Sequence, residues 1–399
     1  MKKSVTKITI WGLILLSPLQ GLFAQNSELN QLIQLAYNQN RDLQMAYKNT
    51  EVHKAQIYTA YEMPKMPVEL QVGNIQNPFV RDYTLGFSQT FDLPSVYKNR
   101  KQYLTSLSQT AAAQADVLKR QLKLEIRMIY ASLSAVNSKT EIINQELEKL
   151  KDLSRVYGQK FDQGETDQSD FLNVRLKENE LTRNLSVLEM ERKNLELQLN
   201  QIVNQTSLPK FSYAEPWTYI GMVNGFIPDN PVKKLNNSFI DNALKEVLTI
   251  KDFKKPSFNA GVYNQSMQGS LRQFVGVMGV EIPIFVKAFN ARQQSAKLRV
   301  EMAEQQRDKF DFQMRAELNS LFNQLEIIEK QLSIIRNSSL PDAEKSLSIL
   351  LNKYKEGQVE YTEWYIVFGQ YLGYKNNLID LEKEKNITIS KIYYISENE

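Results

Sequence analysis

The chain has 399 residues, no cysteine, and 49 basic against 45 acidic residues. Without cysteine it can form neither disulfide bonds nor the lipid-bearing N-terminal cysteine of some exported proteins. Three of the basic residues, Lys2, Lys3 and Lys7, lie at the very N-terminus. The remaining chain is therefore close to neutral, and it lacks the basic excess that indicates a nucleic-acid partner.

The N-terminus has the pattern of a cleaved secretory signal. Its lysines precede an apolar stretch from Ile8 to Leu16, and Gly21 to Ala24 ends the pattern before Gln25. We therefore expect residues 1–24 to be removed on export. The apolar stretch is too short for a spanning helix, and no later apolar run is long enough for one. If the chain crosses a membrane, strands must make the crossing.

The first half, residues 25–204, is predicted to contain a helix, a strand hairpin and a long helical hairpin. Apolar residues recur at helical spacing from about Glu28 to Tyr61. Alternating apolar and polar residues then predict two strands, Val68–Val72 and Tyr83–Phe91, with the apolar side chains on one face.

Two very long helical patterns follow, from about Tyr97 to Asp162 and from about Lys287 to Lys355. At 1.5 Å per residue each rod would reach about 95 Å, too long for a compact domain. The apolar steps alternate between three and four residues, as in coiled coils. Pro341 interrupts only the second rod, which is expected to kink or divide there. Shorter helices, about 168–203 and 361–394, run back and complete two antiparallel hairpins.

Residues 205–235 separate the two halves and contain four prolines and five aromatic residues. That composition is too aromatic for a free linker, so we expect the segment to pack against the rods as a collar. The second half, residues 236–399, repeats the helix, strand hairpin and helical hairpin. Its strands are predicted at Phe258–Val262 and Phe274–Ile282. The alternation in the second of these is too weak to show which face is apolar.

The two halves are copies of each other, offset by about 192 residues. Apolar residues of the first rod recur at this offset in the second, and the turns at the ends of the rods have the same spacing. A duplicated unit has to be explained before any single motif. Corresponding residues are Pro64 and Pro256, Arg100 and Arg292, and the tip motifs Phe161-x-x-Gly164 and Tyr354-x-x-Gly357.

Two hairpins supply four strands of roughly 8 to 11 residues, the length that a tilted strand needs to cross a membrane. Four strands cannot close a barrel, and each unpaired backbone group at an open edge in hydrocarbon costs several kcal/mol. Several chains must therefore share one barrel. The predicted fold class is mainly α with a small β part, built from two repeats and assembled as a trimeric tunnel with an α-barrel and a twelve-stranded β-barrel.

This order of elements resembles the TolC family of outer-membrane efflux channels over the whole mature chain. The most specific parts are the two tip motifs and the strand-to-rod passages that end at Arg100 and Arg292, including Val280-Glu-Ile-Pro283. The resemblance implies a homotrimer in outer-membrane lipid with a long periplasmic extension, acting as a passive exit duct for small molecules or metal ions. It also implies two partners: a periplasmic adaptor (membrane fusion protein) and an inner-membrane pump of the RND type.

The resemblance assigns roles to residues at the two tips. Val359 stands where the best-known member of the family has a latch arginine, and Ile366 stands where it has a second acid, so closure would rest on packing and hydrogen bonds. Each residue also has a simpler reading, as a helix C-cap, a solvated acid or a packing aromatic. The implied adaptor-contacting residues are Gly164, Gly357, Phe161 and Tyr354, and the implied periplasmic gate is Asp170, Tyr354 and Glu363.

Catalysis and cofactor binding have little support in the sequence. His53 is the only histidine, and neither a metal cluster nor a nucleophile–base pair can be assembled around it. The sequence therefore predicts no enzyme and no bound cofactor. Two other functions stay open. One is an outer-membrane duct for type I protein secretion, and the other is a periplasmic coiled-coil scaffold, which would not need the strand hairpins.

Overall fold

The computed structural model describes residues 28–396, except 75–77, 80, 165–167, 210, 214–229, 268–269, 285 and 357. Of Met267, Ser270, Leu271, Arg272, Val286, Asp170, Lys355, Tyr361 and Thr362 it describes the backbone only. The predicted signal, Gly357 and most of the aromatic part of the collar therefore lie outside the described residues.

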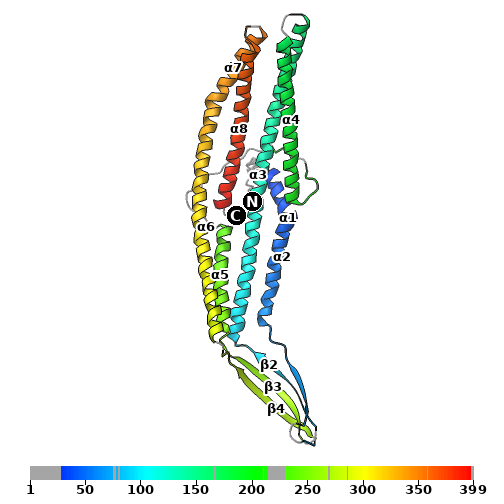
Figure 1. Cartoon of the computed structure of the whole chain (residues 1–399), viewed down its shortest axis with the longest axis vertical. Coiled ribbons are helices and arrows are strands. Elements are labelled where there is room, and N and C mark those ends of the chain that lie inside the picture. The colour runs from blue at the N-terminus through cyan, green and yellow to red at the C-terminus, as the bar shows by residue number, and fades with distance from the viewer. Residues whose placement is uncertain are drawn as a thin grey trace, which may run out of the picture.

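The chain forms a long rod with a small sheet at one end and two helical tips at the other (Figure 1). Two helical hairpins run side by side, and a single helix of 69 residues extends from the sheet to the first tip. Its length, about 100 Å, agrees with the predicted rod. The hairpins are α3 (Pro94–Asp162) with α4 (Gln168–Val203), and α6 (Val286–Ile334) with α7 (Leu340–Lys355) and α8 (Tyr361–Ser396).

The sequence predicts one helix over 28–61, and this prediction is wrong at Asn40. The structure divides the segment into α1 (Glu28–Gln39), α2 (Arg41–Gln56) and the 3₁₀ helix η2 (Ile57–Tyr61). The Asn40 side chain accepts a hydrogen bond of 2.8 Å from the backbone N–H of Leu43, so it caps the start of α2.

The same asparagine joint occurs in both halves. Asn40 Nδ2 donates to the Ile202 carbonyl at 2.8 Å, near the end of α4. Asn230 caps α5 (Pro231–Asp252) by accepting from Val232 N–H, and its Nδ2 donates to the Ile395 carbonyl at 2.6 Å, near the end of α8. Each asparagine satisfies one N–H at the start of a short helix and at least one carbonyl at the end of a long one. The short helices thereby continue the lines of α4 and α8.

The apolar core is spread along the rod. One cluster near the tips takes residues from both hairpins, and a second packs α1 and α2 against the middle of α3. In the second half, the predicted heptad residues Met314, Leu318, Leu321 and Leu325 are buried in one cluster with Ile389, Ile392 and Ile395 of α8. The predicted coiled-coil seam is therefore confirmed.

The second rod breaks where the sequence predicts. A π-helical turn, η3 (Ile335–Ser339), separates α6 from α7, and Pro341 follows in the first turn of α7. Proline has no N–H to donate to the carbonyl four residues earlier, so the hydrogen-bond ladder is displaced at this point. The line of α7 consequently bends away from that of α6 (Figure 1).

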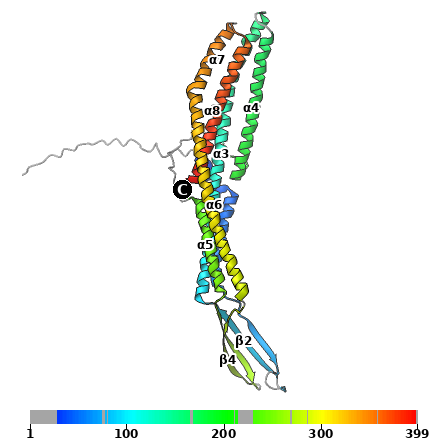
Figure 2. The same ribbon diagram turned by 60° about the vertical axis from the view of Figure 1, so that its left-hand side comes forward.

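The four strands form one antiparallel sheet in the order β1-β2-β3-β4. The two halves of the chain meet where β2 pairs with β3, and the sheet lies beyond the ends of α5 and α6 (Figure 2). Among the described residues β1 and β4 are the edges. In the part of the chain that the structure describes, every helix lacks the apolar length that a bilayer crossing would need. The strands are β1 (Val68–Gly73), β2 (Asp82–Phe91), β3 (Ser257–Met267) and β4 (Ser270–Glu281).

Candidate functional site

The cross-strand register assigns the side chains of the sheet to two faces. Residues directly opposite each other point to the same side. Val68 pairs with Phe87, Phe87 with Val262, and Val262 with Gly276, so one face can be followed across all four strands. It is apolar except for Gln89, Asn264 and Gly276. Its apolar members are Val68, Leu70, Val72, Tyr83, Leu85, Phe87, Phe91, Phe258, Ala260, Val262, Phe274, Met278 and Val280.

This apolar face is uncovered in the single chain, where Phe274 is 74% exposed and Met278 is 93% exposed. A continuous exposed apolar surface marks contact with a membrane or another protein. The opposite face is mostly small or polar, and its apolar or aromatic members are Tyr263, Val275 and Val277. The other members of this polar face are Glu69, Gln71, Gly73, Asp82, Thr84, Gly86, Ser88, Thr90, Ser257, Asn259, Gly261, Gln265, Gln273, Gly279 and Glu281.

Exposed apolar residues continue along two helices at opposite sides of the rod, α4 and α6 (Figure 1). The first-half elements α4 and β1 thus form one edge of the molecule, and the second-half elements α6 and β4 form the other. Both edges therefore expose apolar side chains that the single chain leaves uncovered. The exposed residues are Leu172, Leu176, Val187, Met190 and Leu197 on α4, and Leu298, Met302, Phe312, Ile327 and Ile334 on α6.

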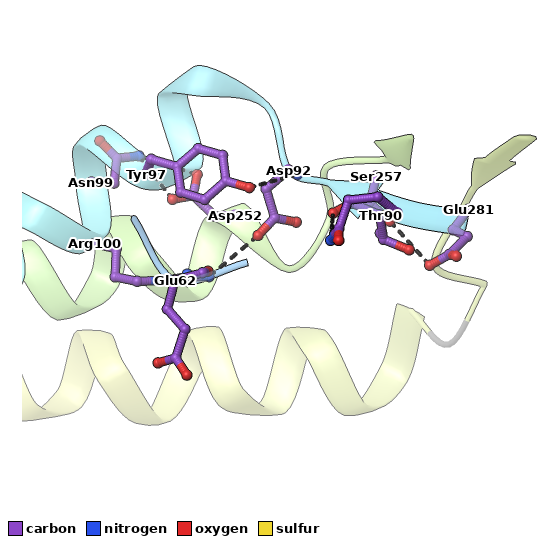
Figure 3. A network of polar contacts seen from close by, with 10 residues as sticks. Glu62, Thr90, Asp92, Tyr97, Asn99, Arg100, Asp252, Ser257 and Glu281 are labelled. Atoms are coloured by element: carbon purple, nitrogen blue, oxygen red, sulfur yellow. Dashed lines mark hydrogen bonds and ion pairs between the residues drawn. The ribbon is translucent and has the colours of Figure 1, made fainter. Parts of the chain in front are cut away.

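A polar network between the sheet and the rods joins the two halves (Figure 3). The Asp252 carboxylate, at the end of α5, accepts from Asn99 Nδ2 at 3.1 and 3.0 Å and pairs with Lys255 Nζ at 2.6 Å. Beside it, Arg100 pairs with Asp92 at 3.3 Å. Because Asp252 is only 8% exposed, its charge is held by these partners more than by water. The network fixes the start of α3 against the end of α5.

The tips are joined by a column of four aromatic rings. Tyr157 of α3 stacks on Tyr354 of α7 with ring centres 4.7 Å apart, and Tyr354 stacks on Trp364 of α8 at 5.9 Å. Trp364 in turn stacks on Phe368 at 4.9 Å. The Tyr157 hydroxyl donates to the Tyr354 carbonyl at 3.0 Å, and all four side chains are buried. These rings and this buried hydrogen bond hold the second hairpin against the first near the tips.

The structure places the predicted tip residues in different surroundings. Tyr354 is 2% exposed within the aromatic column, whereas Phe161 is 37% exposed and stacks on Phe171 at 6.2 Å. Gly164 has φ +73°, the left-handed region that favours glycine. Glu363 is exposed in the first turn of α8. Gly357 and the side chain of Asp170 lie outside the described residues.

The two positions that depart from the family pattern differ in their exposure to solvent. Val359 packs against the apolar tip cluster, and Ile366 is exposed on α8. Neither position supplies a charge. Among the described side chains, the two tips are joined by the stack of Tyr157 on Tyr354 with its hydrogen bond, and by Lys177 of α4, whose Nζ lies 4.9 Å from the centre of the Tyr365 ring of α8.

Sequence reasoning missed the buried polar partners of this region. Glu146 of α3 is 1% exposed, accepts from the Tyr371 hydroxyl at 3.2 Å and pairs with Lys149 at 2.9 Å. Burial, together with the Glu146 carboxylate, raises the pKa of Tyr371. The spacing of Trp364, Phe368 and Tyr371, in steps of four and three, is the sequence signal that could have located this buried face of α8.

Comparison with known proteins gives matches among solved structures only: no protein-family model and no curated protein matches the chain. CusC shares 15% identity, covering 93% of this chain and 92% of its own, with a TM-score of 0.79. The Vibrio cholerae outer membrane protein VceC shares 14%, covering 92% and 96%, with a TM-score of 0.77. The Campylobacter jejuni outer membrane channel CmeC shares 14%, covering 93% and 87%, with a TM-score of 0.74.

The chain has the fold of these outer-membrane channels. The predicted fold class, mainly helical with one small antiparallel sheet, is confirmed. CusC forms a transmembrane channel, and CmeC is an outer membrane channel. Among the described residues, no three histidine or acidic side chains are grouped closely enough to hold a metal ion.

Proposed function

We propose that this chain is the outer-membrane duct of a tripartite efflux system, a passive exit channel for small molecules or metal ions. The observation that carries the proposal is the two-faced sheet: one apolar face is uncovered across all four strands, and the opposite face is mostly small or polar. The fold shared with CmeC, an outer membrane channel, supports the same conclusion.

Lipid is the proposed cover of the apolar face. β2, β3 and β4 have 10, 11 and 12 residues, and a tilted membrane-crossing strand needs roughly 9 to 11. Alternation between an apolar outer face and a polar inner face is the pattern of transmembrane strands. The apolar face would therefore lie in the outer membrane, and the rods would extend into the periplasm.

The two unpaired edges support a homotrimer. In hydrocarbon the open edges of β1 and β4 cannot stay unpaired, so β1 of one copy would pair with β4 of the next. The exposed apolar residues of α4 would face those of α6 on the next copy in the same ring. Such head-to-tail contacts close when the rotation between copies fits, and three copies would give a barrel of twelve strands.

The duplicated plan supports a division of the chain into a signal at 1–24, a first repeat at 25–204, a collar at 205–235 and a second repeat at 236–399. The described part of the collar packs inward, because Tyr213 is buried and lies 5.5 Å from the ring of Tyr130. Burial, with a smaller contribution from Glu196, raises the pKa of Tyr213 to about 12. Helix α5 begins at Pro231, near the end of the collar.

The proposed partners meet the duct at its tips. A periplasmic adaptor would contact the tip residues Gly164, Gly357, Phe161 and Tyr354, and an inner-membrane pump of the RND type would supply the energy. The proposed gate consists of Asp170, Tyr354 and Glu363. Closure by packing is supported by the stack of Tyr354 on Tyr157 and by the apolar side chain at Val359. We assign no catalytic role and no cofactor to the chain.

The membrane part of the proposal is tested by two neighbouring residues of β4. Met278 belongs to the apolar face and Val277 to the polar face. An arginine facing lipid near mid-membrane costs about 2–4 kcal/mol in each chain. Met278→Arg should therefore abolish insertion and conductance in planar bilayers, whereas Val277→Arg should insert and make the channel more anion-selective. Normal conductance of Met278→Arg, or no conductance from the unaltered protein, would overturn the proposal.

The transport part is tested in the cell. A strain without the gene should lose tolerance to toxic compounds or metal ions, and the unaltered gene should restore it. Normal tolerance together with the loss of a secreted protein would instead identify a protein-secretion duct.

A further inference from the structure

On the polar face of the sheet, the ring of Tyr263 lies flat against the backbone. Tyr263 of β3 pairs directly with Gly86 of β2. A Cβ added to Gly86 would lie 2.2 Å from Tyr263 Cδ1, and one added to Gly261 would lie 3.1 Å from Tyr263 Cε2. Real side chains do not make the first of these contacts. The ring therefore occupies the space above both glycines.

The lack of space for a side chain, and not the backbone conformation, explains why Gly86 and Gly261 are glycines. Glycine inside a strand weakens it and often marks the close approach of another group. Gly164 is the one described glycine with positive φ, so Gly86 and Gly261 do not need the left-handed region. Other strand glycines behave differently: a Cβ on Gly276 or Gly73 would meet nothing within 4 Å. Among the described strand glycines, those of the β2–β3 pair, Gly86 and Gly261, are the ones whose space a neighbouring ring occupies.

The surroundings of Tyr263 form a shallow seat of small residues. Ser88 is buried and lies directly opposite Gly261. A Cβ on Gly261 would come within 2.8 Å of the Ser88 Cβ, so larger residues do not fit there either. The seat therefore fixes both the position of the Tyr263 ring and its orientation along the wall of the sheet.

This geometry has a consequence that rests on the proposed function. In the proposed trimer the polar face lines the lumen, and three copies bring three Tyr263 rings to one level of the barrel. We propose that Gly86 and Gly261 hold Tyr263 flat against the barrel wall and so set the bore of the strand part of the channel. A side chain at Gly86 would displace the three rings from the wall into the path of the solute.

Single-channel conductance of the purified, full-length trimer tests this role, with Tyr157→Ala present in every channel compared so that closure of the tips does not limit the current. Gly86→Ala should lower the conductance by roughly a third or more, because pore-lining groups set the passage. The added methyl also lies 2.6 Å from the Val262 carbonyl oxygen, so the double variant Gly86→Ala with Tyr263→Ala is needed. It keeps the backbone contact and removes the ring, and its conductance should return to that of the unaltered protein. Gly276→Ala, on the apolar face, is the matched control and should leave conductance unchanged.

Two results would overturn the inference. One is a conductance of Gly86→Ala equal to that of the unaltered protein, and the other is a conductance of the double variant as low as that of Gly86→Ala alone. If Gly86→Ala yields no trimer, Tyr263→Ala alone decides. A ring that already lies on the wall obstructs little, so its removal should change conductance by no more than about a tenth. A rise of about one half would show that the ring protrudes in the unaltered channel. Absence of conductance from the unaltered protein would count against the proposed channel function instead.

Discussion

The two halves of the chain share one plan but differ in their rods. In the first half α3 is a single helix of 69 residues from the sheet to the tip. In the second half the same path is divided into α6, the π-helical turn η3 and α7. The continuous helix packs against elements of both halves, including α4, α5 and α8. The comparison shows that α3 is the common support of the molecule and that the bend lies in the second hairpin.

The largest expected effect comes from removing the contact between α3 and the second hairpin. Tyr157→Ala deletes a buried ring and its hydrogen bond to the Tyr354 carbonyl, which should cost about 3–5 kcal/mol of local stability. Hydrogen exchange in residues 350–368 should accelerate, and resting conductance in planar bilayers should rise.

Tyr157→Phe is the control for this change, because it keeps the stack and loses only the hydroxyl, at about 1 kcal/mol. Equal exchange rates in the alanine and phenylalanine variants would show that the aromatic column does not hold the tip.

The next effect concerns the feature that the halves share, the asparagine joint. Replacing Asn40 or Asn230 by alanine removes a helix cap and a hydrogen bond to a second helix. The free energy of unfolding should therefore fall by about 1–2 kcal/mol in each variant. The loss should be larger for Asn230, which donates to both the Tyr394 and Ile395 carbonyls. Thermal unfolding followed by circular dichroism measures the difference.

Asparagine-to-aspartate variants separate the two parts of the joint. Aspartate keeps the acceptor that caps the short helix and loses the donor to the long one. Aspartate variants as stable as the unaltered protein would show that the link between helices contributes nothing.

A smaller effect is expected where the halves differ. Pro341→Ala restores an N–H to the second rod and should convert the π-helical turn to α-helix, with a gain of at most about 1 kcal/mol. The distance between spin labels on α6 and α7 should increase as the rod straightens. An unchanged distance would show that packing of α7 on α8, and not the proline, causes the bend.

The smallest effect is expected at an ion pair between the halves. Asp380 of α8 binds Lys139 of α3 at 2.8 Å and Lys383 at 3.0 Å. Partial burial raises the pKa of Asp380, but both lysines lower it by more, so the pKa lies below its usual 3.8. The pair stabilises the fold above about pH 4, and the contribution is lost as pH falls further through the lowered pKa.

Asp380→Asn should therefore lower the free energy of unfolding at pH 7 by only about 0.5 kcal/mol, because water screens this partly exposed carboxylate. Urea unfolding of both proteins at pH 7 and at successively lower pH measures this difference. A difference between the two proteins that does not shrink as pH falls would show that charge is not its cause.

Features with a local cause could be predicted from the sequence. The seam through Met314, Leu318 and Leu321 follows from heptad spacing, and the break in the second rod follows from Pro341. The apolar face of the first strand hairpin follows from alternation. Each of these features depends on residues within a few positions of one another, so one chain segment contains the whole signal.

Features with distant partners could not be predicted. The break at Asn40 depends on the Ile202 carbonyl, 162 residues away. The burial of Tyr354 depends on Tyr157 in the other half. β4 has valine on both faces, so only its register with β3 shows that Val277 lies on the polar side. The sequence located the tips by the spacing of Gly164, but not the aromatic column between them.

The central claim is that copies of this chain close a ring by pairing β1 with β4. Because the chain has no cysteine, Glu69→Cys in β1 combined with Val277→Cys in β4 places one thiol at each edge of the polar face. After treatment of the membrane-inserted protein with a short bifunctional maleimide, denaturing electrophoresis should show a species of three chains and none larger, and neither single-cysteine variant should give it. Only monomers, or an open series of larger species, would contradict the account.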